Sequence, residues 1–98
     1  MKESQEQLRQ ELARLFARVR SQREFEVFID GLFTPPEVED FVQRWRLMRR
    51  LHDGEAQRDI SKDLGISLGK IARGSRLLKY GPDEFRELME RLLSEEKE

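Results

Sequence analysis

The chain has 98 residues, no cysteine, one histidine and a formal net charge of -1. A chain this short is expected to form one domain, and it buries only a modest share of its surface alone, so a core shared by two chains would relieve that limit. The lack of cysteine excludes disulfides and thiolate metal sites, and His52 alone cannot form a histidine metal cluster. No stretch approaches the roughly 20 apolar residues of a membrane span, so we expect a cytoplasmic protein without metal or membrane contact.

The charges are segregated along the chain. Residues 1–40 carry a net charge of -3, residues 41–80 carry +6 and residues 81–98 carry -4. A basic block between acidic ones suits a phosphate-binding face, because neutralising phosphates supplies much of the affinity for DNA. A solvated basic surface without a partner explains the charges equally well, so the charges alone do not decide between the two.

Apolar residues recur at helical spacing through most of the chain. Thr34 is a suitable cap and Pro35 a suitable first residue for one of these helices, and Gly54 is a natural stop for it. A last helix is expected over residues 82–95, with a frayed tail of sequence SEEKE. The other stripes are Leu8, Leu12, Leu15, Phe16 and Val19 in a first helix over residues 4–20; Phe25, Phe28, Ile29, Leu32 and Phe33 in a second; and Val38, Phe41, Val42, Trp45, Met48 and Leu51 in a third.

These stripes offer more apolar surface than a domain of this size readily encloses. We therefore expect an all-α fold of about six helices in a homodimer, in which residues 1–54 and 82–95 provide the dimerisation helices and residues 1–98 form a single domain. A monomeric helical bundle has the same periodicity, so periodicity alone does not separate the two. Trp45 is expected in the dimer core, and Arg46, Arg49 and Arg50 are expected to form a solvated or phosphate-facing helix edge.

Residues 57–80 have the layout of a helix-turn-helix, a motif whose second helix reads base edges in the major groove. Its turn, cap and core positions are Gly65, Ser67, Ile60, Leu64, Ile66, Ile71 and Leu78. The remaining face is small or cationic, and its expected DNA-binding residues are Arg58, Lys62, Leu68, Gly69, Lys70, Ala72, Arg73, Arg76 and Lys79. A helical hairpin that only resembles the motif is the alternative, and it gives no reason for the cationic side.

With these segments placed, the sequence resembles the tryptophan repressor family of ligand-regulated, intertwined helical dimers. The likeness covers roughly residues 31–79 and is carried by LFTPPEVE, QRWRLMRRLHDGE, AQRDISKDLG and IARGSRLLK. A glycine inside the recognition helix is locally costly by roughly 1 kcal/mol, so we expect close approach of a ligand or of DNA backbone at Gly74. The resemblance implies an intertwined homodimer that represses transcription by binding a palindromic operator in double-stranded DNA.

The resemblance also implies a corepressor between the third helix and the recognition helix. Arg44 and Arg73 match two arginines that sandwich the ligand, and such guanidinium planes can stack on an aromatic ring and pair with a carboxylate. L-Tryptophan or a related aromatic amino acid is the implied corepressor. The ligand-binding residues carried over by the resemblance are Gly31, Phe33, Thr34, Arg44, Met48, Arg73, Gly74 and Leu77.

Several positions depart from the family pattern. The serine that helps to hold the ligand amine corresponds to Leu77, a leucine corresponds to Gly31, and Ala56 stands where a capping serine or threonine is usual. A DNA-binding regulator of the same fold that does not respond to tryptophan is therefore an alternative, and a helical protein-binding module is a third. An enzyme is not expected, because one histidine and scattered carboxylates do not assemble a nucleophile, a base and an orienting residue.

Overall fold

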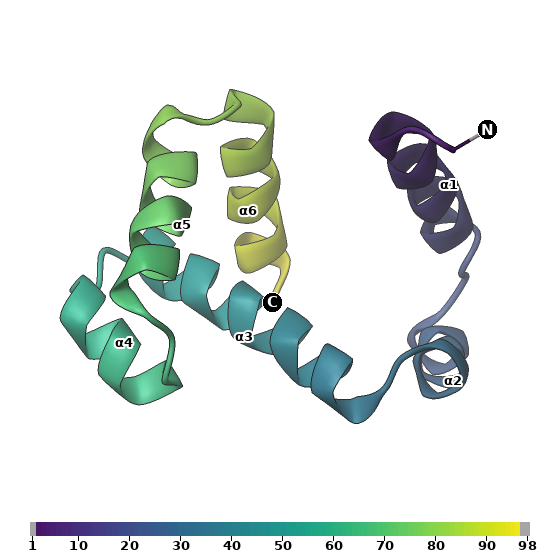
Figure 1. The fold of residues 1–98 in the computed structure, drawn as a ribbon, viewed down its shortest axis with the longest axis horizontal. Coiled ribbons are helices and arrows are strands. Elements are labelled where there is room, and N and C mark those ends of the chain that lie inside the picture. The colour runs from purple at the N-terminus through teal and green to yellow at the C-terminus, as the bar shows by residue number, and fades with distance from the viewer. Residues whose placement is uncertain (1, 97–98) are drawn as a thin grey trace. The chain divides into compact units, whose positions relative to one another are not determined.

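A computed structural model describes residues 2–96 of the chain. Six α-helices and no β-strand make up this described part (Figure 1). The helices are α1 (Gln5–Ala17), α2 (Gln22–Leu32), α3 (Pro35–His52), α4 (Gln57–Leu64), α5 (Leu68–Tyr80) and α6 (Asp83–Glu96). The prediction of an all-α chain with about six helices is confirmed. Within residues 2–96, no helix is both long enough and apolar enough to cross a bilayer.

The chain divides into two compact units, and the boundary lies between Val38 and Glu39, inside α3. The N-terminal unit contains α1, α2 and the first turn of α3. The C-terminal unit contains the rest of α3 together with α4, α5 and α6. The division of the chain into dimerisation helices and a DNA reader stays a prediction.

The start of α1 is fixed by a capping box. The hydroxyl of Ser4 accepts a hydrogen bond from the backbone N–H of Gln7, and the backbone N–H of Ser4 donates to the side chain of Gln7 at 2.8 Å. The helix ends at Ala17, earlier than the predicted limit of residue 20, and the N–H of Arg18 donates to carbonyls of the last turn. These short-range bonds close the helix before the apolar stripe itself ends at Val19.

Pro35 opens α3, as predicted. The backbone N–H and the hydroxyl of Thr34 both donate to Oε1 of Glu37, each at 2.9 Å. These hydrogen bonds, the backbone one more than the hydroxyl one, hold the pKa of the Glu37 carboxyl below its usual value of 4.5, because both favour the charged form. At the other end, α3 stops at His52, and Gly54 follows with φ of 81°, a left-handed conformation that glycine adopts without strain.

Phenylalanine rings pack α1 against α2 in the N-terminal unit. The ring of Phe16 meets those of Phe25 and Phe28 edge-to-face, with centroids 5.2 Å and 5.7 Å apart. No residue of α1 or α2 is buried, and Val27 and Leu32 remain 57% and 63% exposed. The ring cluster therefore joins the two helices and half-buries its phenylalanines, but it leaves other apolar side chains of these helices exposed.

The core of the C-terminal unit forms where α3, α4 and α5 meet. Leu47, Ile60 and Ile71 are buried in one cluster, and Leu51, Leu64 and Ile66 pack against it. Leu47 was absent from the predicted α3 stripe, whereas Phe41, which was part of that stripe, is 55% exposed. The α3 surface that packs against α4 and α5 therefore includes Leu47 as well as Leu51 of the predicted stripe, while Phe41 of that stripe stays exposed.

The last helix continues further than predicted. α6 runs to Glu96, so the expectation of a frayed SEEKE tail is wrong up to that residue, and residues 97 and 98 lie outside the described part. Met89 and Leu93 are buried on its inner face. Arg49 of α3 pairs with Glu96 at 3.1 Å, so both an apolar stripe and an ion pair hold the end of α6.

Candidate nucleic-acid interface

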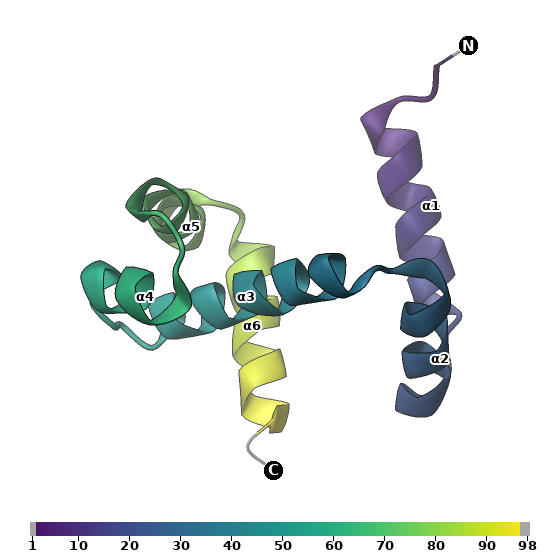
Figure 2. The ribbon, with the colours of Figure 1, turned by 60° about the horizontal axis from the view of Figure 1, so that its bottom comes forward.

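The turn between α4 and α5 is held by glycine and serine residues. Gly65 has φ of 67° and donates its N–H to the carbonyl of Ser61 at 2.9 Å. The hydroxyl of Ser61 donates to the carbonyl of Ile66 at 2.7 Å, and Ser67 accepts from the N–H of Lys70 at 3.3 Å as the cap of α5. The predicted left-handed turn and the predicted cap are confirmed. Both views show α4 and α5 crossing rather than running parallel (Figure 2).

The aliphatic positions of this helix pair face inward. Ile60 of α4 and Ile71 of α5 are fully buried, and Leu64, Ile66 and Leu78 are half-buried. These are the five positions that the sequence predicted for the inner side. Since that side is buried against α3, the opposite side of the pair faces away from the core.

The outward side of α4 and α5 is cationic. Eight of the nine residues expected to bind DNA are exposed, and Ala72 is half-buried. None of the cations among them forms an ion pair with a carboxylate in residues 2–96, whereas arginines elsewhere in the C-terminal unit do. These unpaired cations are Arg58 and Lys62 on α4 and Lys70, Arg73, Arg76 and Lys79 on α5. They are free to neutralise phosphates.

The first turn of α5 has a different character. Leu68 is 52% exposed, and a Cβ added to Gly69 would meet open space. The turn contains no acidic residue. A helix start with small, exposed residues and no acidic side chain can approach a base edge or a thymine methyl group closely.

One arginine of α3 is placed differently from the prediction. Nη2 of Arg50 lies 2.7 Å from a carboxylate oxygen of Glu55 and 2.7 Å from one of Asp63. Hydrogen bonds to these two carboxylates raise the pKa of Arg50 above its ordinary value. Arg50 therefore does not form the expected solvated or phosphate-facing edge. Arg46 is exposed, and Arg49 pairs with Glu96 while its side chain stays 43% exposed. The partners lie five or more residues away in sequence, so helical spacing gave no signal for these pairs.

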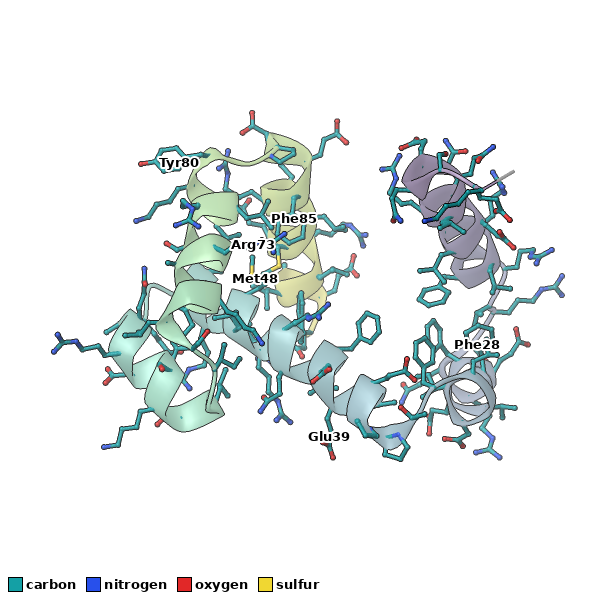
Figure 3. All side chains as sticks on the ribbon, in the orientation of Figure 1. Phe28, Glu39, Met48, Arg73, Tyr80 and Phe85 are labelled. Carbon is teal, nitrogen blue, oxygen red and sulfur yellow. The ribbon has the colours of Figure 1, made fainter. Side chains whose placement is uncertain are left out.

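Gly74 is buried where α5 meets α3. A Cβ on Gly74 would lie 3.1 Å from Sδ of Met48 and 3.2 Å from Cδ1 of Leu51. In Figure 3, Met48 lies beside the middle of α5, near Arg73. The close approach predicted at Gly74 is therefore made by α3 itself, and helix packing accounts for the glycine without a ligand or a DNA backbone.

The other expected ligand-binding residues of the C-terminal unit are accessible. Arg44 and Arg73 are exposed and have no carboxylate partner among the described residues, and Leu77 is 41% exposed. Met48 is half-buried. This part of the α3 and α5 surface thus combines free guanidinium groups with apolar side chains, which suits an anion that carries an apolar group.

The expected ligand-binding residues of the N-terminal unit are partly engaged. Gly31 and Thr34 are exposed, and the hydroxyl of Thr34 already donates to Glu37. Phe33 is half-buried, with its ring 6.3 Å from that of Phe28. An open cavity of about 600 Å³ in this unit lies at the turn from α1 to α2 and contains none of the expected ligand-binding residues. No cluster of acidic or histidine side chains within residues 2–96 could hold a metal ion.

A crossed helix pair with a buried aliphatic side and an unpaired cationic side, in a small all-α chain, is typical of the class of small helical proteins that bind nucleic acid. Within that class, the chain belongs to the Trp repressor family, because the family model described as Trp repressor protein matches residues 6–93. The family is regulatory and not enzymatic. The resemblance found in the sequence is therefore confirmed at the level of the family.

Individual relatives agree with this assignment. A Trp operon repressor homolog of Vibrio vulnificus strain YJ016 is 38% identical over 73 residues, which span 74% of this chain and 72% of the relative. The uncharacterized protein YerC of Bacillus subtilis strain 168 is 32% identical over 91 residues, which span 90% of this chain and 88% of the relative. The crystal structure of a TrpR like protein from Eubacterium eligens matches with a TM-score of 0.72 and 27% identity, over 88% of this chain and 89% of that one.

Proposed function

We propose that the chain is a cytoplasmic transcriptional repressor that binds a palindromic operator in double-stranded DNA through α4 and α5. One observation carries this proposal: the cations on the outer side of this helix pair are exposed and have no carboxylate partner in the described chain. The buried aliphatic inner side fixes which face is presented. Membership of the Trp repressor family supports the same role.

The contacts divide into two groups. Leu68 and Gly69 enter the major groove with the first turn of α5, and Arg58 reaches a guanine edge or a phosphate. Ala72 and Arg73 lie further along the groove-facing side of α5. The cations that contact the phosphate backbone, where contacts orient the protein without reading sequence, are Lys62, Lys70, Arg76 and Lys79.

We further propose a homodimer as the DNA-binding form. Leu8 and Leu12 of α1 and Leu32 of α2 are 44%, 49% and 63% exposed, and on α6 Leu88 and Leu92 are 43% and 38% exposed. Exposed apolar surface of this kind marks a contact with another chain. A palindromic operator needs two recognition helices about 34 Å apart, and a second copy supplies the second helix.

The proposed corepressor is an aromatic amino acid, with L-tryptophan as the first candidate. Arg44 and Arg73 support it, because each is exposed and unpaired in the described chain and can stack on a ring or pair with a carboxylate. Met48 and Leu77 complete the C-terminal unit's share of this site. Gly31, Phe33 and Thr34 of the N-terminal unit are proposed to bind ligand because the family resemblance implies it.

A second candidate is a repressor of the same fold that ignores tryptophan. Leu77 favours it, because an apolar side chain offers no hydrogen bond to a ligand amine. The hydroxyl of Thr34 also favours it, because it already donates to Glu37.

Selection of duplexes from a random-sequence library, followed by binding titrations at several salt concentrations, tests DNA binding. The logarithm of the binding constant should fall with the logarithm of salt concentration by about 0.9 per phosphate contacted. Failure to enrich any duplex would contradict the proposal and favour a protein-binding module. Calorimetry with the twenty amino acids then separates the two candidates, since heat with L-tryptophan supports the first and no heat with any amino acid supports the second.

A further inference from the structure

One face of α3 holds the last turn of α4 through three successive positions. Gln43, Leu47 and Arg50 are spaced by four and three residues and so share a side of the helix. Nε2 of Gln43 donates to the carbonyl of Leu64 at 3.4 Å, Leu47 is buried in the cluster with Ile60, and Arg50 donates to Asp63 in the last turn of α4. Along α3, the buried contact of Leu47 therefore lies between the polar contacts of Gln43 and Arg50.

Arg50 makes the strongest of these contacts. Its Nε donates to Glu55, in the turn before α4, at 2.8 Å, and its Nη2 donates to Asp63, in the last turn of α4, at 2.7 Å. The Arg50 side chain is 21% exposed, less than either carboxylate. One planar guanidinium thus joins the chain before α4 to the end of α4, a geometry that the point charge of a lysine does not reproduce.

The neighbouring residue contacts the other helix of the pair. Cδ1 of Leu51 lies 3.2 Å from the Cβ position of Gly74 in α5. Two adjacent residues of α3 therefore contact both helices, Arg50 through its ion pairs with α4 and Leu51 through packing against α5. The 65–67 turn links α4 to α5, so the placement of one helix constrains the other.

We infer that Arg50 is a positioning residue for operator recognition, which binds no DNA itself but fixes α4, and with it the outward face of α5, on α3. This inference rests on the DNA-binding function proposed above. Partly exposed ion pairs contribute little to stability. The effect of Arg50 should therefore be found in sequence-specific binding, which needs correct helix geometry, rather than in non-specific binding, which needs only cations.

The test compares Arg50→Gln with Arg49→Gln. Both variants lose one positive charge from the end of α3, but Arg49 pairs with Glu96 of α6 and not with α4. The probes are a duplex that the wild type selects from a random-sequence library and poly(dI-dC) as non-specific DNA. Arg50→Gln should weaken binding to the selected duplex about 5- to 20-fold and leave poly(dI-dC) binding within about twofold, whereas Arg49→Gln should change both by less than about twofold.

Further variants separate positioning from charge. Arg50→Lys keeps the charge and should restore only part of the lost specific affinity. Asp63→Asn added to Arg50→Gln should cause no further loss, because both changes break the same bridge. Equal weakening of both DNA probes with a salt slope lowered by about 0.9 would show that Arg50 contacts phosphate, and would overturn the inference. Unchanged specific affinity in Arg50→Gln would also overturn it.

Amide hydrogen exchange gives a readout that does not depend on DNA. Arg50→Gln should speed exchange in residues 57–64 and leave α6 unchanged, and Arg49→Gln should do the reverse. If the wild type selects no duplex, the proposed function fails, and this measurement still tests the bridge. Unchanged exchange in α4 of Arg50→Gln would overturn the inference even where DNA binding is intact.

Discussion

Sδ of Met48 lies 3.1 Å from where a Cβ would stand on Gly74, so α5 approaches α3 closely at this point. A larger side chain there must displace Met48 and Leu51, because both contact the added atom. Gly74→Val should therefore lower the free energy of unfolding by about 1–3 kcal/mol, as overpacked cores do. Denaturant unfolding followed by circular dichroism measures the change.

Gly69→Ala is the matched control for that substitution. Both glycines lie in α5, but a Cβ on Gly69 meets open space. Alanine is the better helix former by about 0.8–1 kcal/mol, so Gly69→Ala should raise the free energy of unfolding by up to that amount. Equal destabilisation by the two changes would show that packing on α3 does not explain Gly74.

Truncation in the C-terminal core should be costly. Ile71 is fully buried in the cluster with Leu47 and Ile60. Ile71→Val should lower the free energy of unfolding by about 0.5–1.5 kcal/mol, since it removes one buried methylene group. Leu68→Ala, on the exposed start of the same helix, should lower the free energy of unfolding by less. A larger decrease for Leu68→Ala would contradict the assignment of inner and outer faces.

The cationic face predicts a defined change in salt dependence. Lys79→Gln removes one unpaired cation of α5, so the slope of the logarithm of the binding constant against that of salt concentration should fall by about 0.9. Arg91→Gln is the control, because Arg91 lies on α6 and pairs with Glu95 at 2.9 Å. An equal change of slope in both variants would place the phosphate contacts elsewhere.

Replacing Leu77 should change the affinity of the proposed site for L-tryptophan. Leu77→Ser adds a hydroxyl that can accept a hydrogen bond from a ligand ammonium, so L-tryptophan should bind about tenfold more tightly by calorimetry. Arg73→Ala should abolish that binding. Tryptophan binding that survives in Arg73→Ala would contradict the proposed site.

The stability of the start of α3 should depend on pH through the Glu37 carboxyl. Its pKa is lowered in the folded chain by bonds from Thr34, so its stabilising contribution is present above the unfolded pKa of about 4.5 and is lost as pH falls through the folded value. The amide of Thr34, whose N–H donates to Glu37, should therefore show less protection from exchange at acid pH. Glu37→Gln should remove this pH dependence, and an unchanged acid response in that variant would contradict the role of Glu37.

The helices and their ends were largely predictable because their causes are local. Gly65 needs a left-handed conformation, and Pro35 and Ser67 suit helix starts wherever they occur in a chain. The exposure of the α4 and α5 cations also followed from helical periodicity.

Packing between helices was less predictable. Leu47 is buried although it lies outside the stripe predicted for α3. Phe41 belongs to that stripe but is exposed in the single chain. Arg50 meets its carboxylates across a helix end, where neither helical nor strand spacing applies. A ligand or DNA backbone was expected close to Gly74, whereas the structure places side chains of α3 there, and sequence spacing gives no signal for that contact.

Hydrogen exchange of the chain with and without a selected duplex tests directly whether the outer face of α4 and α5 binds DNA. Added duplex should slow exchange at the start of α5, around Leu68, Gly69 and Lys70, more than anywhere in α1 or α2. Protection confined to α1 and α2, with α4 and α5 unchanged, would contradict the assignment of this face to DNA.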